Sequence, residues 1–282
     1  MSAPGILAGL IGRGIQASRT PALHEAEGDA QALRYLYRLI DADQLGVDDS
    51  ALPQLLDAAQ RTGFTGLNVT FPFKQAILPL LDELSEEARG IGAVNTVVLR
   101  DGRRIGHNTD CLGFAEGFRR GLPDVERRQV VQLGAGGAGS AVAHALLAEG
   151  VERLVLFEVD TARGQALVAN LAQRFGAGRA VLGQDLASAM AEADGLVNTT
   201  PVGMAKLPGM PLPVQLLQAR LWVAEIIYFP LETELLRQAR ALGCRTLDGG
   251  TMAVFQAVKA FELFSGRPAD AERMQAHFAS LG

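Results

Sequence analysis

The sequence predicts an α/β protein of two domains, and three observations support this fold class. Strand-like and helix-like segments alternate along the chain, as they do when helices cover a sheet. The expected strands of the second half are continuously apolar, which is typical of a parallel sheet buried on both faces. With 282 residues, 48% of them hydrophobic, the chain is long enough for two domains that each bury a core.

The first part of the chain contains three strand-like and three helix-like segments before an expected hairpin. Asp49 and Ser50 are expected to introduce the second of the helices. The hairpin is predicted because Asp101 and Gly102 form a two-residue turn signal between two extended runs. In order, the expected elements are strand 5–12, helix 21–33, strand 35–40, helix 51–63, strand 64–70, helix 72–92 and hairpin 93–110.

A short helix and the polar stretch "PDVERR" lead into a second α/β series. It starts with the strand "QVVQL" and a glycine-rich turn, and two helices close the chain. Periodicity alone does not assign these last helices to either domain. The expected elements are helix 111–122, strand 129–133, helix 162–175, strands 194–200 and 221–228, and helices 251–266 and 270–282.

Three glycines form a G-x-G-x-x-G pattern between the strand "VVQL" and the following helix. Gly134 allows a tight turn, Gly136 lets a pyrophosphate approach the backbone, and Gly139 permits close packing of helix on strand. The start of the helix then faces the phosphates with its N–H groups. The pattern favours a Rossmann-type doubly wound sheet that binds a dinucleotide, while a glycine-rich turn without a ligand is the alternative.

An acidic residue about 20 residues after the glycines is expected to bind the adenosine ribose. Glu158 stands at that point, and its carboxylate would repel the 2′-phosphate of NADP. Asp160 adds negative charge, although it is equally well placed to cap the next helix. Arg163 is the nearby cation, available to stack on adenine or to neutralise a 2′-phosphate. The two carboxylates outnumber the one cation, and this negative charge predicts NAD in preference to NADP.

Charge and composition exclude several classes of protein. The formal net charge is −5, with no basic cluster that would indicate nucleic acid or an anionic membrane. The N-terminal segment lacks the basic region of a signal peptide, and no apolar stretch approaches ~20 residues. Cys111 and Cys244 are near no histidine cluster, so neither zinc nor a disulfide is indicated. We therefore predict a cytoplasmic protein that acts on a small molecule and binds no metal.

Polar residues that a core does not require follow the expected strands of the first part. "NVTFPFK" supplies Asn68, Thr70 and Lys74, and the hairpin segment supplies Asn95 and Asp110. Such residues are often turn or capping residues. Lys74 can also give a proton to a carbonyl oxygen or take one from an alcohol, which is the chemistry that a hydride transfer needs.

Seven ordered motifs give the chain its resemblance to the shikimate and quinate dehydrogenases, over essentially the whole length. They are "SRTPALHEAEG", "GLNVTFPFKQAILPLLDE", "GAVNTVV", "GHNTDCLGF", "GAGGAGSAVAHAL", "NTTPVGM" and "LDGGTMAVFQAVKAFELFSG". The resemblance implies an N-terminal α/β substrate domain and a Rossmann domain separated by a cleft. It also implies that the last helices return to the substrate domain. The expected ranges are 1–109 with 250–282 for substrate and 110–249 for NAD.

The resemblance also implies roles for individual residues. Ser18 and Thr20 would bind the carboxylate of a cyclitol acid, and Lys74 would be the general acid and base, held by Asp110. The ring hydroxyls would be bound by Asn68, Thr70, Asn95, Asp110 and Gln256. The cofactor would contact Gly134, Ala135, Gly136, Gly137, Ala138, Gly139, Glu158, Asp160, Arg163, Asn198, Thr199, Thr200 and Gly249.

Two departures from the commoner biosynthetic members refine the expected activity. This chain has "SRTP" where they carry "SxSP", and "EVDT" where NADP-dependent members usually have "NRT". The first is similar to the NAD-preferring quinate/shikimate dehydrogenases, and the second agrees with the charge argument for NAD. We predict NAD-dependent oxidation of quinate or shikimate at C3 by a monomer or homodimer. The alternatives are a relative with a shifted substrate such as aminoshikimate, a non-catalytic NAD-binding regulator, or the NADP-linked biosynthetic enzyme.

Overall fold

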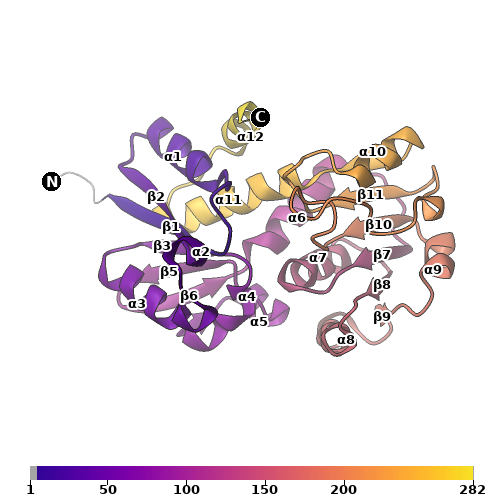
Figure 1. Ribbon diagram of the computed structural model, residues 1–282, viewed down its shortest axis with the longest axis horizontal. Helices are drawn as coiled ribbons and strands as arrows, with labels where there is room; N and C mark the ends of the chain where they lie inside the picture. Colours follow the sequence, from indigo (N-terminus) through magenta and orange to yellow (C-terminus); the bar gives the residue numbers. More distant parts are fainter. Residues whose placement is uncertain (1–4, 282) are drawn as a thin grey trace. The chain divides into compact units, whose positions relative to one another are not determined.

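The structure is a computed structural model that describes residues 5–281, and the chain forms two compact units (Figure 1). The first unit comprises Met1–Thr109 and Val254–Gly282, and the second comprises Asp110–Ala253. The junctions fall near the start of helix α6 (Thr109–Gly121) and within helix α11 (Gly249–Ser265). Each helix is therefore continuous through a junction.

The first unit contains a mixed six-stranded sheet in the order β2-β1-β3-β5-β6-β4. Strands β1, β2 and β3 are parallel, whereas β5 pairs antiparallel with both β3 and β6. The predicted hairpin is confirmed: Asp101 and Gly102 have φ values of 51° and 76°, as the tight turn between β5 and β6 requires. The strands are β1 (Ile6–Gly12), β2 (Tyr35–Asp41), β3 (Gly66–Val69), β4 (Glu83–Leu84), β5 (Thr96–Arg100) and β6 (Arg103–His107).

Alternating side chains of these strands enter two cores, one on each face of the sheet. Ile11 packs with residues of α3 on one face, while Ala8 and Leu10 pack with α11 on the other. This side-to-side alternation fixes the register, because a shift by one residue would exchange the faces. The remaining helices of the first unit are α1 (Thr20–Ala30), α2 (Ala42–Leu45), α3 (Leu52–Arg61), α4 (Phe73–Ala76), α5 (Glu86–Ile91) and α12 (Ala271–Ser280), with short 3₁₀ turns η1 (Asp49–Ala51) and η2 (Leu78–Leu80).

The prediction of one long helix over 72–92 is wrong. The segment divides into α4, η2, the short strand β4 and α5. Pro79 explains the first break, because its ring excludes the carbonyl four residues earlier and it has no N–H to donate. Ser85 explains the second start, since its side chain accepts the N–H of Ala88 and caps α5.

The start of α3 also differs in detail from the prediction. Residues Asp49–Ala51 form the 3₁₀ turn η1, and the capping side chain is that of Asp48, which accepts the Ser50 N–H. The helix itself then begins at Leu52 with Pro53 in its first turn, where a missing N–H costs nothing.

The second unit contains an all-parallel sheet in the order β12-β11-β10-β7-β8-β9. Read from its first strand, this is the doubly wound order 3-2-1-4-5-6, so the predicted Rossmann-type fold is confirmed (Figure 1). The order reverses between β7 and β10, where such folds bind their ligands. The strands are β7 (Gln129–Leu133), β8 (Arg153–Phe157), β9 (Ala180–Leu182), β10 (Gly195–Asn198), β11 (Trp222–Glu225) and β12 (Arg245–Leu247).

Helices cover both faces of this parallel sheet. Val130 faces a core with α6, α7 and α8, and the next residue, Val131, faces a core with α9 and α10. The elements after β8 include β9, β12, α9 and α10, which the sequence analysis did not predict. The helices are α7 (Gly137–Ala148), α8 (Thr161–Phe175), α9 (Leu186–Glu192) and α10 (Glu234–Ala241), with the 3₁₀ turn η3 (Val214–Leu216).

Candidate functional site

The three glycines after β7 differ in the space around them. Gly134 has φ +95°, a conformation that side chains strain to adopt, and a Cβ on Gly139 would lie 2.7 Å from the carbonyl oxygen of Gly134. A Cβ on Gly136 would meet nothing within 4 Å. Gly136 is the N-cap of α7 and supplies no side chain to its first N–H groups. The structure therefore disfavours a side chain at Gly134 and Gly139, whereas the space beside Gly136, where α7 begins, is empty of protein atoms. Such a space is what a pyrophosphate requires.

Two buried side chains hold this turn in place. The Thr199 hydroxyl oxygen lies 2.7 Å from the carbonyl oxygen of Leu133 and 2.9 Å from that of Gly134. Gln132 donates to the carbonyl oxygens of Gly134 and Gly139 at 2.9 and 2.8 Å. Thr199 was predicted to contact the cofactor, and the structure gives it contacts with the glycine turn. Gln132 was missed, although an amide inside an apolar strand is itself a signal.

Glu158 joins the glycine turn to α8. Its carboxylate accepts the N–H of Ala135 at 2.7 Å, and it accepts the Arg163 guanidinium at 2.8 Å. Burial alone would raise the pKa of Glu158, but the Arg163 guanidinium and the backbone N–H groups of Asp160 and Ala135 outweigh it, so the pKa is lowered. The side chain is therefore an ionised carboxylate at neutral pH, and Arg163 is engaged by it.

Asp160 has a structural role in the first turn of α8. Its side chain accepts the backbone N–H of Arg163 at 3.1 Å and is the N-cap of the helix. Helix capping is one of the two roles that the sequence allowed for Asp160.

A second polar cluster lies at the ends of β10 and β11. Asn198 donates to the Val202 carbonyl at 3.0 Å and to the Glu225 carboxylate at 3.0 Å, and it accepts the Thr200 hydroxyl at 2.7 Å. Burial raises the pKa of Glu225 to about 7, partly offset by the hydrogen bonds from Asn198, Thr233 and the backbone. Asn198 and Thr200 were predicted site residues, whereas Glu225 was not predicted from the sequence.

Gly249 begins α11 against the backbone that follows β11. A Cβ there would lie 2.4 Å from the carbonyl oxygen of Ile226 and 2.5 Å from that of Ile227. Close approach of two backbone segments therefore excludes any side chain at this position, independently of a cofactor.

In the first unit, the segment "SRT" forms the entry to α1. The Ser18 and Thr20 hydroxyl oxygens lie 3.1 Å apart, and Ser18 also accepts the Thr20 N–H at 3.3 Å. Arg19, between them, stacks on the ring of Phe278 in α12, with its guanidinium carbon 5.2 Å from the ring centroid. The Ser18 hydroxyl donates to Thr20 here, but hydroxyl hydrogens rotate, so the two adjacent hydroxyls can form a donor pair for a carboxylate.

A buried hydrogen-bond network joins predicted residues from distant parts of the first unit. Asn95 accepts the Thr109 N–H at 2.7 Å, and its amide nitrogen lies 3.4 Å from the Gln256 side-chain oxygen. Thr96 donates to Asn95 at 3.0 Å and accepts from Asn68 at 3.0 Å. The structure thus brings Asn68, Asn95 and Gln256 into one network.

Thr70 and Lys74 follow β3 at the same edge of the sheet. The Thr70 N–H donates to Ile11 at the end of β1, and the Lys74 carbonyl accepts the N–H of Val94 at 2.8 Å. Lys74 is half-buried in α4, and its backbone is hydrogen-bonded to Val94, the residue that precedes Asn95. Asp110, 5% exposed, is the second residue of α6.

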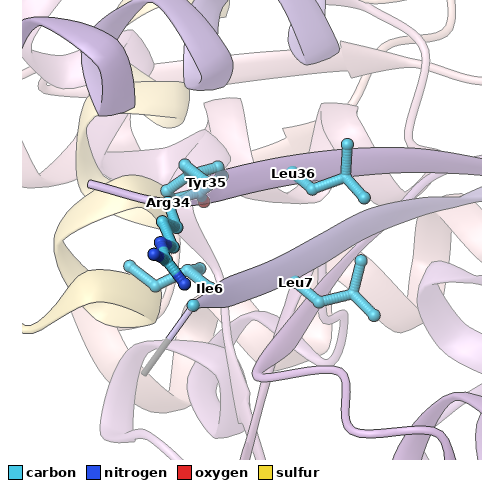
Figure 2. Close-up of a pocket in the computed structure, with 6 residues that line it drawn as sticks. Ile6, Leu7, Arg34, Tyr35 and Leu36 are labelled. Atoms are coloured by element: carbon cyan, nitrogen blue, oxygen red, sulfur yellow. The ribbon is translucent and has the colours of Figure 1, made fainter. Parts of the chain in front are cut away.

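A cavity of about 400 Å³ lies elsewhere in the first unit, between the starts of β1 and β2 (Figure 2). It is lined by Gly5, Ile6, Leu7, Arg34, Tyr35 and Leu36, mostly apolar side chains at the amino ends of the strands. The predicted residues lie at the carboxyl ends, so this cavity is not the candidate site.

Within residues 5–281, no group of three or more His, Cys, Asp or Glu side chains is arranged to hold a metal. No described helix has the length and hydropathy needed to cross a bilayer.

Comparison with known proteins identifies similar chains. Residues 10–97 match the family model described as shikimate dehydrogenase substrate binding domain. A shikimate dehydrogenase (NADP(+)) of Streptomyces avermitilis is 56% identical over 100% of this chain and 97% of its own. A quinate/shikimate dehydrogenase (NAD(+)) of Corynebacterium efficiens is 53% identical over 100% of both chains. A solved quinate dehydrogenase from Corynebacterium glutamicum in complex with NAD is 50% identical with a TM-score of 0.91, over 98% of this chain and 99% of its own.

Proposed function

The chain belongs to the shikimate and quinate dehydrogenase family, and from this premise we propose that it oxidises quinate or shikimate to the 3-dehydro acid with NAD as hydride acceptor. The second unit would bind the dinucleotide and the first unit the acid. The observation that supports the choice of cofactor is the Glu158 carboxylate. It is ionised, and it pairs with the cation that a 2′-phosphate would need.

The residues of the second unit fit a dinucleotide. The open space above Gly136 would take the pyrophosphate at the start of α7, where the helix dipole favours an anion. Glu158 would exchange the N–H of Ala135 for the hydroxyls of the adenosine ribose. Thr199 and Gln132 would keep the turn fixed during binding, and Asn198 and Thr200 would shape the segment near the nicotinamide.

The residues of the first unit fit a hydroxylated carboxylic acid. Ser18 and Thr20 would donate to the carboxylate, and Thr70 and the amides of Asn68, Asn95 and Gln256 would bind ring hydroxyls. Amides both donate and accept, as hydroxyl groups do, so they can bind several hydroxyls in a fixed arrangement.

Lys74 would take the proton of the reacting alcohol. Oxidation of a secondary alcohol removes a hydride from carbon and a proton from oxygen, and bound NAD supplies the hydride acceptor. The amine of Lys74 would receive the proton as the carbonyl forms, and the ammonium would return it in the reverse reaction. We propose Asp110 as the second catalytic residue, which holds this ammonium in position.

Initial rates test this proposal. Quinate and shikimate are each supplied with NAD and with NADP, and formation of reduced cofactor is followed. Turnover with NAD on either acid is the expected result, with a lower kcat/KM for NADP. No turnover in any of the four combinations would overturn the proposal.

The NADP-linked enzyme is the second candidate, because the Streptomyces avermitilis relative at 56% identity is named for NADP(+). Under that reading Arg163 leaves Glu158 to bind the 2′-phosphate. Turnover with NADP alone would establish it.

A further inference from the structure

We propose that Tyr37 and Thr96 are positioning residues that fix the side-chain amide of Asn68 for substrate binding. The inference rests on the proposed function, which makes Asn68 a ligand of the acid. Neither Tyr37 nor Thr96 was predicted from the sequence. Both are buried beside Asn68, with exposed fractions of 4% and 0%.

The sheet explains how Tyr37 reaches Asn68. Tyr37 lies on β2 and Asn68 on β3, with β1 between them. The residue of β1 paired in register with Tyr37 is Ala8, whose small side chain leaves the phenol ring room to extend over the central strand. The Tyr37 hydroxyl then lies 2.7 Å from Oδ1 of Asn68.

Two backbone groups determine the orientation of the Asn95 and Asn68 side-chain amides in this network. The Thr109 N–H can only donate, so the atom of Asn95 that it meets at 2.7 Å is the oxygen Oδ1. The Thr96 hydroxyl donates to that oxygen, and its own oxygen therefore accepts from Asn68. The Asn68 nitrogen also faces the Asn95 carbonyl, which can only accept, at 3.4 Å.

It follows that the end of the Asn68 amide facing Tyr37 is the oxygen, and that the phenol donates to it. Oδ1 retains a second lone pair after it accepts this bond. Asn68 is therefore presented to the acid as an acceptor, and the hydroxyl that it binds must donate. Loss of either the Tyr37 or the Thr96 hydroxyl removes one of the two side-chain partners that hold the amide in this orientation.

Tyr35 provides a matched control on the same strand. It lies two residues from Tyr37, so both side chains leave β2 on the same face, and both belong to the same core. Its hydroxyl is also buried and hydrogen-bonded to one side chain, Nδ1 of His24 at 2.9 Å. The two tyrosines differ in their partner: one contacts the Asn68 network and the other does not.

The experiment compares Tyr37→Phe with Tyr35→Phe in the full-length enzyme. We expect Tyr37→Phe to lower kcat/KM for the acid about ten-fold, mostly through KM, because the Asn68 amide loses one buried hydrogen bond. The KM for the dinucleotide should not change. Tyr35→Phe should leave both KM values as in the unaltered enzyme, while the two variants lose similar amounts of thermal stability.

A second pair of variants covers the case in which Tyr37→Phe does not fold. Thr96→Val removes the other partner of Asn68 and should raise the KM for the acid. Thr65→Val is its control, because the Thr65 hydroxyl bonds only the backbone carbonyl of Leu7, at 3.1 Å, among the contacts that the described residues show. In addition, Tyr37→Phe should have little further effect on kcat/KM when Asn68 is already alanine.

The outcomes separate this inference from the function on which it rests. Turnover by the unaltered enzyme, with equal KM for the acid in the variants and their controls, would overturn the positioning role and leave the proposed function intact. Absence of turnover by the unaltered enzyme with either acid would overturn both. A raised KM for the acid in a folded Tyr37→Phe or Thr96→Val variant, with an unchanged KM in Tyr35→Phe and Thr65→Val, would support the inference.

Discussion

The two units shape their candidate sites by different means. The second unit uses its main chain. Gly136 leaves space beside the backbone, and Gly134 and Gly139 allow a tight turn that side chains would disturb. The first unit uses side chains, in a network in which amides and hydroxyls fix one another. A site made by the main chain depends on residues close in sequence, whereas a side-chain network depends on residues that only the fold brings together.

The largest expected effect tests the proton transfer proposed for Lys74 of the first unit. Lys74→Met should lower kcat about 10³-fold, because it removes the group that takes the alcohol proton. The dissociation constant for NAD should stay as in the unaltered enzyme, since the proposed dinucleotide residues are in the second unit. Initial rates and calorimetric titration with NAD measure the two quantities. A kcat near that of the unaltered enzyme would remove Lys74 from the mechanism.

A pair of glycine variants tests the main-chain site of the second unit. Gly136→Ala places a methyl group where no protein atom lies within 4 Å, so the melting temperature should not change. The methyl group would occupy the proposed pyrophosphate space, and NAD binding should weaken roughly 10- to 100-fold.

Gly139→Ala is the contrasting variant. Its Cβ would lie 2.7 Å from the Gly134 carbonyl oxygen, so this change should lower the melting temperature before any ligand is added. Equal NAD affinity in Gly136→Ala and the unaltered protein would show that the open space is not a pyrophosphate site.

The same contrast explains how much of the molecule could be predicted. The glycine turn and the Rossmann-type sheet were predicted because their signals are local: glycines at fixed spacing between an apolar strand and a helix. The segment 72–92 was mispredicted because its apolar spacing suits a helix, and the effect of Pro79 was not weighed against it.

Within the candidate sites, the missed residues are buried polar groups with distant partners. Tyr37 and Asn68 are 31 positions apart, and Asn198 and Glu225 are 27 apart. Gln132 differs from these pairs, since its partners are backbone carbonyls and its polar side chain in an apolar strand was a local signal. Nothing in the sequence marks such pairs until strand order is known.

A third prediction concerns Glu158, the carboxylate that joins the glycine turn to α8. Glu158→Gln should lower the preference for NAD over NADP about ten-fold, because it removes the charge that repels a 2′-phosphate and releases Arg163. Asp160→Asn is the control, since asparagine still caps α8 and Glu158 keeps its partners. The ratio of kcat/KM for the two cofactors is the measurement, and an equal change in both variants would contradict the role of Glu158.

The smallest expected effect compares two buried carboxylates, one in each unit. Glu27 and Glu225 are both 1% exposed. Burial raises the pKa of each, but at Glu27 the Arg273 guanidinium, the backbone N–H of Asp270 and the side-chain amide of Gln31 reverse this and lower the pKa. Glu225 accepts from the neutral groups of Asn198, Thr233 and the backbone, and its pKa rises to about 7.

The opposite shifts give opposite dependences of stability on pH. Between the ordinary pKa of 4.5 and about 7, folded Glu225 keeps a proton that the unfolded chain has released, so its contribution to stability falls as pH rises through this window and is level above it. The contribution of Glu27 is constant there and is lost only as pH falls below 4.5. The melting temperature of the unaltered protein relative to Glu225→Gln should therefore decline by a few degrees between pH 5 and pH 8. The difference relative to Glu27→Gln should stay level over the same range. A level difference for Glu225→Gln would mean that this carboxylate is already ionised at pH 5, and that neutral donors stabilise it as well as the guanidinium stabilises Glu27.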